Sequence, residues 1–316
     1  MAQESKENRA VNKSRSFEYA YSNISICHFD ALLADIDKLD REGKLSDHTV
    51  YRRYLEDVKY RTPEGFPDVQ SIIMIAVFTK PMLVDFYFKG KKHEIMVPPQ
   101  YYDDGITEKD LRRTVLNDIL RIPGWKLERA KHVSLKLLAV RSGLGRYGRN
   151  NVCYVDGMGS LLTLYAYFTD FQFEMDNWHE IIMMDICEDC ETCISECPTN
   201  SLNKKNFVID AGRCLTLYNE IKGEFPEWID PLAHNTLMGC MRCQLCCPAN
   251  QEALRRSGRF ENVTEEETEK ILEGHVDEEI ANSLSRKLRM FSPENAHDFF
   301  PILRRNLSVL LLKRAL

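Results

Sequence analysis

Apolar residues along the first 180 residues follow two different periods. Residues 71–79 form an apolar, β-branched run between Pro67 and Pro81, which predicts a strand buried on both faces. Residues 17–39 predict a strand followed by a helix, because residues 22–27 favour extended structure and helical spacing then sets in. The apolar positions of that helix are Leu32, Leu33, Ile36 and Leu39.

Further elements are expected up to residue 168. Residues 107–122 predict a helix capped by Thr107 with Asp110, ended by Pro123-Gly124, with Leu111, Val115, Ile119 and Ile122 on its apolar face. A second helix is expected over 132–140, ended by Gly143. Two strands are expected over 152–155 and 161–168, joined by a turn at 156–159. The first 180 residues therefore predict one mixed domain of helices and strands.

The rest of the chain has a different pattern. Residues 187–250 are rich in cysteine and lack long periodic runs, which predicts a small domain held together by metal. Amphipathic helices are expected around 280–291 and over 302–312. We therefore predict an α+β protein with three parts: an α/β domain (1–180), a ferredoxin-like domain (181–255) and a helical tail (256–316).

Composition excludes several classes of protein. The chain has 42 Lys and Arg against 48 Asp and Glu, so its net charge of −6 argues against a generally basic nucleic-acid binder. No basic start followed by an apolar stretch indicates a secretory signal, and the uncharged stretch 157–169 is too short to span a membrane. The expected location is the cytoplasm, with no membrane partner.

Cysteine usage is the strongest chemical signal. Nine of the 11 cysteines lie between Cys187 and Cys247. Structural disulfides are rare in a reducing compartment, so cysteines concentrated in this way indicate metal binding. The isolated Cys27 and Cys153 fall in expected strands and are interpreted as small buried hydrophobic residues.

The first cysteine motif has the bacterial ferredoxin spacing. Cys187, Cys190 and Cys193 are separated by two residues each, and Cys197 follows after three and precedes Pro198. In two-cluster ferredoxins the first three cysteines of such a motif bind one [4Fe-4S] cluster and the fourth binds the other. Two zinc sites are the alternative, but zinc requires neither the third cysteine at the same interval nor the Cys-Pro pair.

The second motif mirrors the first. Two residues separate Cys240 from Cys243, and Cys247 precedes Pro248 as the last cysteine of the first motif precedes its own proline. By reciprocity, Cys247 completes the first cluster with Cys187, Cys190 and Cys193. The second cluster then has Cys197, Cys240 and Cys243 and requires a fourth ligand. Cys246 and Cys214 are both candidates at this point.

A glycine-rich loop precedes the cysteine motifs. Residues 141–151 include Gly143, Gly145 and Gly148, close to the pattern of a nucleotide-binding loop. That pattern requires a strand before the loop and a helix after it, and the expected order here is the reverse. The glycines instead indicate a tight turn or a backbone that closely approaches a large flat ligand.

These motifs together resemble the epoxyqueuosine reductase family, which is cobalamin- and iron–sulfur-dependent and related to reductive dehalogenases. The resemblance includes the glycine loop, the Gly159-Ser160 pair, Cys214 between the two cysteine motifs, and the run Gly239-Cys-x-x-Cys-Gln-x-x-Cys-Pro248. It also includes residues 303–306 near the end of the chain.

The resemblance implies a set of cofactors and ligands. Cys214 rather than Cys246 would be the eighth cluster ligand, and cobalamin would bind without a histidine below the cobalt. The implied corrinoid-binding residues are Gly143, Gly145, Arg146, Tyr147, Gly148, Asn150 and Ser160. Electrons from an external flavodoxin or ferredoxin would pass through the clusters to the corrinoid and then to an organic substrate.

One departure concerns the proton donor. The family's presumed donor is an Asp shortly before a Pro, upstream of the glycine loop, and the matching residues 127–132 contain neither. Glu128 is the candidate replacement, with residues 101–104 as alternatives. The family's loop tryptophan is replaced by Arg146.

Three functions follow for testing. The first is a cobalamin-dependent reductase of an organic substrate, with epoxyqueuosine in tRNA as the named candidate. The second is an electron-transfer protein that reduces or reactivates corrinoid proteins. The third is a cluster protein without corrinoid. A basic C-terminal tail is a candidate tRNA contact, although a solvated helix face explains it as well: Arg286, Lys287, Arg289, Arg304, Arg305, Lys313 and Arg314.

Overall fold

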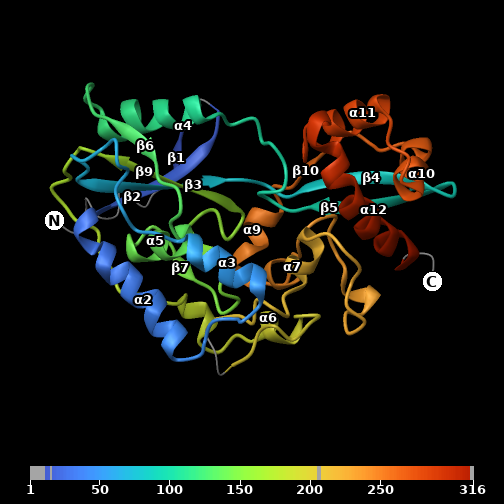
Figure 1. Ribbon diagram of the computed structural model, residues 1–316, viewed down its shortest axis with the longest axis horizontal. Coiled ribbons are helices and arrows are strands. Elements are labelled where there is room, and N and C mark those ends of the chain that lie inside the picture. Colours follow the sequence, from blue (N-terminus) through green and yellow to red (C-terminus); the bar gives the residue numbers. More distant parts are fainter. Residues whose placement is uncertain (1–10, 15, 205–207, 314–316) are drawn as a thin grey trace. The chain divides into compact units, whose positions relative to one another are not determined.

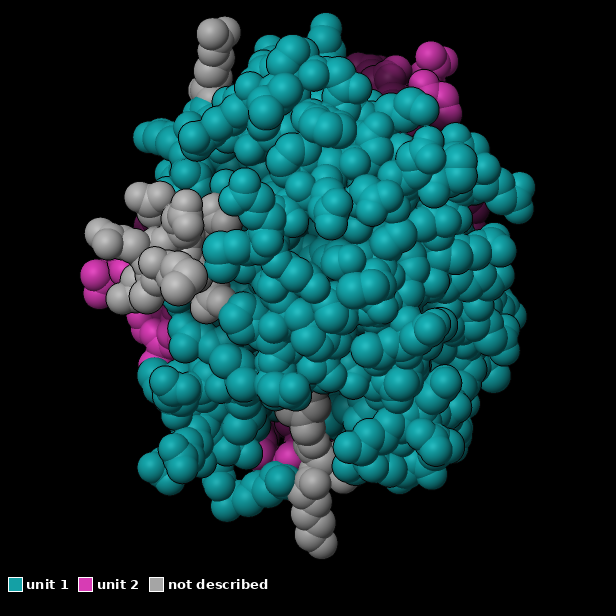
Figure 2. Space-filling model, turned by 90° about the vertical axis from the view of Figure 1, so that its left-hand side faces the viewer, with its two compact units in different colours: residues 1–78, 105–191, 204–209 teal, residues 79–104, 192–203, 210–316 magenta. Residues whose placement is uncertain are grey.

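The computed structural model describes residues 11–14, 16–204 and 208–313 (Figure 1). The chain forms two compact units, coloured separately in Figure 2. Unit 1 comprises Met1–Phe78, Gly105–Glu191 and Lys204–Ile209, and unit 2 comprises Thr79–Asp104, Thr192–Asn203 and Asp210–Leu316. The three-part division of the chain at residues 180 and 255 remains a prediction.

Unit 1 is built on a five-stranded antiparallel sheet. Its order is β1 (Asn12–Lys13), β2 (Glu18–Ser25), β3 (Ser71–Phe78), β9 (Leu162–Thr169) and β6 (Leu127–Arg129). The central strand β3 is buried over its first seven residues, as its apolar run predicts. Mixed helix and sheet are confirmed as the fold class.

Alternate residues of β3 enter two different cores. Ile72, Met74 and Ala76 pack with Leu32 of α2 (Phe29–Arg41) and with Leu138 of α5 (Leu135–Arg141). The intervening residues of β3 pack on the opposite face against α4 (Glu108–Thr114) and the π-helical turn η2 (Val115–Leu120). The period of two along the strand thus places helices on both faces of the sheet (Figure 1).

Smaller elements complete unit 1. They are η1 (Ile26–His28), α3 (Thr49–Asp57), β7 (Arg146–Tyr147), β8 (Cys153–Tyr154) and η3 (Asp185–Cys187).

Unit 2 combines a hairpin with helices from the C-terminal third of the chain. Strands β4 (Met82–Phe88) and β5 (Lys91–Val97) are joined at Lys89-Gly90, whose φ values of 50° and 67° are those of a tight hairpin turn. Strand β10 (Gly258–Arg259) pairs with β4 in parallel.

Three helices share one core with this sheet. The helices are α10 (Glu265–Glu273), α11 (Glu278–Leu288) and α12 (Ala296–Lys313), and their core residues include Phe86, Leu284 and Leu303. The short elements of unit 2 are α6 (Thr192–Ser195), α7 (Leu215–Glu220), η4 (Pro231–Ala233), α8 (Arg242–Leu245), η5 (Pro248–Asn250), α9 (Gln251–Leu254) and η6 (Pro293–Asn295). Among the described residues, no helix combines the length and apolar character needed to cross a lipid bilayer.

Several local expectations are confirmed. The strand and helix of residues 17–39 are β2 and α2, and Thr107 and Asp110 form the capping box of α4. The amphipathic pattern after residue 280 corresponds to α11, and the pattern of 302–312 lies within α12.

Other expectations are corrected. Ile122 is 54% exposed, because the helical segment ends at Leu120 and Arg121 turns the chain with a φ of 58°. The helix expected from residue 132 begins at Leu135. The strands expected to pair across the turn at 156–159 belong to different sheets, since β8 pairs with β7 while β9 pairs with β3 and β6. The β4–β5 hairpin and helix α10 were not predicted.

A buried ion pair joins two of the C-terminal helices. Lys287 Nζ lies 2.6 Å from Glu267 Oε2, and both side chains are about 10% exposed or less. Glu267 also accepts hydrogen bonds from Ser283 Oγ and from the backbone N–H of Thr264, the capping residue of α10. Burial alone raises the pKa of Glu267, but these contacts outweigh it and lower the pKa below its ordinary value.

Glu267→Gln is expected to lower the free energy of unfolding by about 3 kcal/mol at neutral pH, because it leaves the Lys287 ammonium buried without its counter-charge. Urea unfolding followed by circular dichroism measures this. A lowered pKa stabilises the fold above the unfolded-state value of 4.5 and ceases to do so as pH falls through the folded-state value. The difference between variant and parent should therefore shrink in acid. Glu269→Gln, an exposed change on the same helix, is the control and should alter stability by less than about 0.5 kcal/mol.

Candidate metal centres and the glycine loop

Four cysteines of unit 2 lie in short helices or in the loops beside them. Cys197 follows α6, Cys214 is the N-cap of α7, Cys240 follows Gly239, and Cys243 lies in α8. Helices α6 and α8 pack against each other. The four thiols thus lie on short helices and on the loops between them, an arrangement compatible with cluster binding.

The pKa values of these thiols report their proximity. Burial raises the pKa of Cys240, and the neighbouring Cys214 and Cys197 raise it further. Burial also raises the pKa of Cys243 well above its ordinary value, and Cys240, Cys214 and Cys197 again add to the effect. Four thiolates placed so close together would repel one another unless a cation were bound among them.

Two polar side chains contact the cluster sulfurs. Ser201 Oγ lies 3.3 Å from Cys197 Sγ, and Asn235 Nδ2 donates to Cys240 Sγ at 3.2 Å. Burial raises the pKa of Cys197, but the hydrogen bond with Ser201 contributes to a net lowering. Hydrogen bonds to sulfur stabilise the more negative, reduced form of a cluster and so raise its reduction potential.

A tyrosine–glutamate pair lies beside the same cysteines. The Tyr101 hydroxyl donates a hydrogen bond to Glu220. Burial raises the pKa of Tyr101, and the neighbouring Glu220, Cys214 and Cys240 raise it further. A Cβ atom on Gly239, whose φ is +61°, would lie 2.5 Å from the Tyr101 hydroxyl, so glycine is required there both by its backbone and by the space.

The first cysteine motif begins in unit 1. Cys187 ends η3, and Cys190 follows in the next turn. The Arg149 guanidinium donates to the carbonyl oxygens of Cys187 at 3.1 Å, Cys190 at 3.0 Å and Glu188 at 3.1 Å. One planar side chain thus fixes the backbone that carries two of the cysteines predicted to bind a cluster.

Arg149 belongs to the glycine loop, which is a closed hairpin. Strands β7 and β8 pair, with Arg146 opposite Tyr154. A Cβ atom on Gly145 would lie 2.6 Å from Cys153 Sγ, and one on Gly148 would lie 2.5 Å from the Tyr154 ring. Packing within the hairpin therefore accounts for both glycines, as the tight-turn interpretation predicts.

The loop also joins the cysteine segment by backbone hydrogen bonds. The Tyr147 N–H donates to Ile182 O at 3.1 Å, and the Met184 N–H donates to Tyr147 O at 2.9 Å. Together with Arg149, these bonds hold the glycine loop against the segment that leads to Cys187. The loop and the first cluster ligands are therefore one structural element of unit 1.

The residues predicted to contact a corrinoid divide into two sets. Gly143, Gly145 and Arg146 line a cavity of about 140 Å³, and Arg146 bonds Asp156 at 2.8 Å. Tyr147, Asn150 and Ser160 are buried, with Asn150 donating to the Tyr154 hydroxyl. This cavity is smaller than the 300–1,000 Å³ typical of ligand pockets, so within unit 1 it can accept only an edge of a corrinoid, such as one amide side chain.

The remaining candidates are placed as follows. Glu128 is exposed on β6, the edge strand of the sheet. Cys153 is buried in β8, as expected, but Cys27 is exposed in η1, so its interpretation as a buried residue is wrong. Sequence reasoning did not identify Arg149, Asn235, Ser201 or Glu220. Of these four residues, only Arg149 could have been suspected from the sequence, because it lies within the glycine loop.

Most bases of the C-terminal tail have partners within unit 2. Lys287 bonds Glu267, Arg286 bonds Glu261, and Arg289 lies over the rings of Tyr102 and Phe260. Arg304 donates to Leu272 O. The side chain of Lys313 and all of Arg314 lie outside the described residues.

Two neighbouring residues of α12 support the cluster region. Arg305 donates to the carbonyl oxygens of Tyr218 and Ile221 around the end of α7, and Asn306 donates to Asn219 O and Leu237 O. These residues of the run 303–306 therefore brace the helix that begins at Cys214. A tRNA-binding interpretation of the tail is not needed to explain them.

The cysteine arrangement defines an iron–sulfur protein. Residues 186–250 match the family model of the 4Fe-4S double cluster binding domain. The prediction of two [4Fe-4S] clusters is confirmed at the level of this domain, while the assignment of individual ligands remains a proposal.

The fold identifies the relatives. The chain is similar to the structure of epoxyqueuosine reductase from Streptococcus thermophilus, with a TM-score of 0.63 and 18% identity over 99% of this chain and 80% of that one. It is equally similar to a crystal structure of epoxyqueuosine reductase with an epoxyqueuosine-modified tRNA stem loop, with a TM-score of 0.63 and 20% identity over 98% of this chain and 79% of that one.

Curated sequences give the same family name. The chain is 38% identical over 117 residues to epoxyqueuosine reductase of Aliivibrio fischeri, covering 37% of this chain and 30% of the relative. It is 32% identical over 131 residues to the Escherichia coli enzyme, covering 41% and 31%. The matches thus span about a third of the length of these relatives. The predicted resemblance to epoxyqueuosine reductases is confirmed in sequence and in fold.

The choice between Cys214 and Cys246 can be tested by iron content. Anaerobically prepared protein should contain about eight irons per chain. Cys214→Ala should reduce this to about four, because Cys214 lies among the other three thiols, whereas Cys246→Ala should retain about eight. Iron and acid-labile sulfide assays measure this. The opposite pattern would assign Cys246 as the ligand.

Arg149→Ala is expected to lose the cluster bound through Cys187 and Cys190, because the backbone carrying them loses its clamp. Arg149→Lys should be almost as defective, since an ammonium group cannot bridge three carbonyls in the plane of a guanidinium. Iron assays and electron paramagnetic resonance of the reduced protein should show about four irons remaining. The control is Arg146→Ala in the same loop, which should keep eight irons. Full iron content in Arg149→Ala would contradict the clamp.

Proposed function

We propose that this chain is an oxidoreductase of the epoxyqueuosine reductase type, with two [4Fe-4S] clusters that deliver electrons to a corrinoid and an organic substrate. The observation that carries the proposal is the set of eight appropriately spaced cysteines in a fold that matches epoxyqueuosine reductases over nearly the whole chain. The named substrate, epoxyqueuosine in tRNA, is that of these relatives and is proposed here by similarity.

The stoichiometry of the reaction supports two clusters. Converting an epoxide to an alkene releases its oxygen as water and consumes two electrons and two protons. Each [4Fe-4S] cluster carries one electron at a time, so a pair of clusters can hold both. An external one-electron donor, flavodoxin or ferredoxin, would refill them.

The ligand sets proposed for the clusters follow from spacing and from the thiol group of unit 2. Cys187, Cys190, Cys193 and Cys247 would bind the first cluster, and Cys197, Cys214, Cys240 and Cys243 the second. The mutual effects on pKa among the latter four cysteines support Cys214 as the eighth ligand.

The corrinoid is proposed to contact the glycine loop. When bound, it supplies a reducible cobalt centre that can act on a carbon–oxygen bond. Gly143, Gly145 and Arg146 would hold one edge of it, and the buried Tyr147, Asn150 and Ser160 would keep the loop in shape. Because Arg149 ties this loop to Cys187 and Cys190, a corrinoid there would lie close to the first cluster.

Glu128 is the proposed proton donor, in the segment where relatives carry the catalytic Asp. Its exposed position on an edge strand is compatible with access to a large substrate such as tRNA. The lack of an Asp in residues 127–132 also fits a second function, an electron-transfer protein that reduces or reactivates corrinoid proteins, because that activity requires no proton donor. The two functions differ in whether an organic product forms.

Anaerobic protein with intact clusters is expected to change the absorption spectrum of added cobalamin and, with a strong reductant, to convert epoxyqueuosine in a tRNA stem loop to queuosine. Mass spectrometry of the digested RNA detects the loss of one oxygen. Glu128→Gln should lower turnover by about 100-fold or more while leaving cobalamin binding unchanged, as expected for loss of a general acid.

The controls separate the alternatives. Cobalamin binding without turnover, together with reduction of an added corrinoid protein, would favour the electron-transfer function. An unchanged cobalamin spectrum at saturating protein would exclude the reductase with its own corrinoid. Full activity of Glu128→Gln would exclude Glu128 as the donor but not the reductase.

A further inference from the structure

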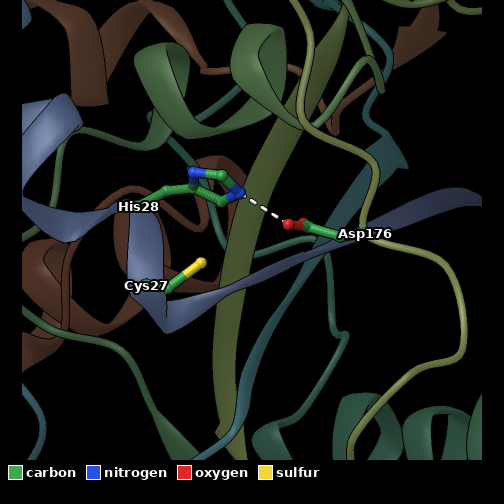
Figure 3. Close-up of side chains that lie close together, drawn as sticks. All are labelled: Cys27, His28 and Asp176. Atoms are coloured by element: carbon green, nitrogen blue, oxygen red, sulfur yellow. Dashed lines mark hydrogen bonds and ion pairs between the residues drawn. The ribbon is translucent and has the colours of Figure 1, made fainter.

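A cysteine, a histidine and an aspartate converge in unit 1, apart from the cysteine motifs. Cys27 and His28 are consecutive residues of η1, and Asp176 lies in the segment after β9 (Figure 3). Their ligand atoms all lie within 4.8 Å of one another, and His28 Nε2 lies 2.6 Å from Asp176 Oδ2. Among the described residues, only this group brings three such ligands so close together.

The backbone around the three residues is held by several hydrogen bonds. The Ser25 N–H donates to Asp176 Oδ1 at 3.0 Å, which fixes the carboxylate. Beside it, Asn23 Nδ2 donates to Met175 O at 2.8 Å, and Asn177 Nδ2 donates to Asn23 Oδ1 at 3.0 Å. The two asparagine contacts join the end of β2 to the segment carrying Asp176 independently of the three candidate ligands.

The histidine ring is oriented by stacking. His28 stacks on Trp178 with ring centroids 4.0 Å apart and planes 8° apart, and the Arg141 guanidinium lies over the same indole at 4.7 Å. Arg141 is itself held by two hydrogen bonds to Asp35. Packing of this kind fixes the plane of the imidazole, so that its Nε2 atom points toward Asp176.

We propose that Cys27, His28 and Asp176 bind a Zn²⁺ ion, with water completing a tetrahedral site. Thiolate, imidazole and carboxylate together form a ligand set that zinc favours, and three protein ligands with one open position form a common type of zinc site. Binding takes place through the Cys27 thiolate, because every ligand atom must be deprotonated, and the ion replaces the hydrogen bond between His28 Nε2 and Asp176 Oδ2.

The geometry requires only a small adjustment. Around tetrahedral zinc, a nitrogen and an oxygen ligand lie about 3.3 Å apart, so the 2.6 Å contact between His28 and Asp176 must open by about 0.7 Å. The Asp176 side chain is 40% exposed and Cys27 is exposed, so both can rotate without disturbing the core. The ion would then connect the corner between β2 and α2 to the segment after β9.

The test uses the 316-residue chain with its clusters loaded, so that eight of the nine cysteines from Cys187 to Cys247 are occupied by iron. Isothermal titration with Zn²⁺ under anaerobic conditions should detect one site per chain. Cys27→Ser, His28→Gln and Asp176→Asn should each weaken zinc binding by at least about 10-fold. X-ray absorption at the zinc edge should show one sulfur ligand in the parent protein and none in Cys27→Ser.

The matched control is His275→Ala. His275 Nδ1 lies 3.2 Å from Glu273 Oε2, so this pair offers an exposed imidazole and a carboxylate in another part of the chain. Zinc affinity should be unchanged in this variant. Iron content and circular dichroism confirm that each variant is folded, and Asp176→Asn preserves the shape of the side chain. Equal zinc affinity in the parent protein and in Cys27→Ser, a zinc spectrum without sulfur, or no zinc binding at all would overturn the proposal.

Discussion

Buried thiolates need a compensating positive charge, and this requirement organises the cysteine-rich part of the chain. Cys214, Cys240 and Cys243 are largely withdrawn from water, and each of them has a raised pKa because of burial and because of its cysteine neighbours. Iron removes that penalty, so folding of this region and assembly of its cluster are coupled. The hydrogen bond of Asn235 to Cys240 and the braces from Arg305 and Asn306 help to hold the thiols in this arrangement.

In unit 1, Arg149 holds the backbone around two cysteines of the first motif. Its five N–H donors allow a single side chain to bond the carbonyls of Cys187, Glu188 and Cys190, and it stands in the loop proposed to contact the corrinoid. A shift of that loop would therefore be transmitted directly to two cluster ligands. This connection gives a physical reason for the close succession of a glycine loop and a ferredoxin motif along the chain.

The sequence predicted those features that depend on spacing between neighbouring residues. The cysteine intervals indicated the clusters, and the apolar run of β3 indicated a strand buried on both faces. The Thr107 capping box was equally readable, since cap and partner are three residues apart.

Features that depend on distant contacts were missed. The β4–β5 hairpin is stabilised by helices that begin at Glu265. The sequence near residue 90 does not indicate that these distant helices will pack against it. The exposure of Cys27 follows from the η1 turn, and its proximity to Asp176 follows from the pairing of Asn23 with Met175 and Asn177. Arg149 donates to backbone carbonyl oxygens. Every residue has such an acceptor, so the sequence does not show which ones Arg149 contacts.

The long separation in sequence between the β4–β5 hairpin and the helices that cover it has a consequence for biosynthesis. The β4–β5 hairpin ends at Val97, whereas the helices that cover its apolar face begin at Glu265 and are made much later. Val84 and Phe86 therefore remain without their helical neighbours until those helices have been translated. During that interval the nascent hairpin is a natural site for chaperone binding or aggregation, and slow translation of the C-terminal third would lengthen the exposure.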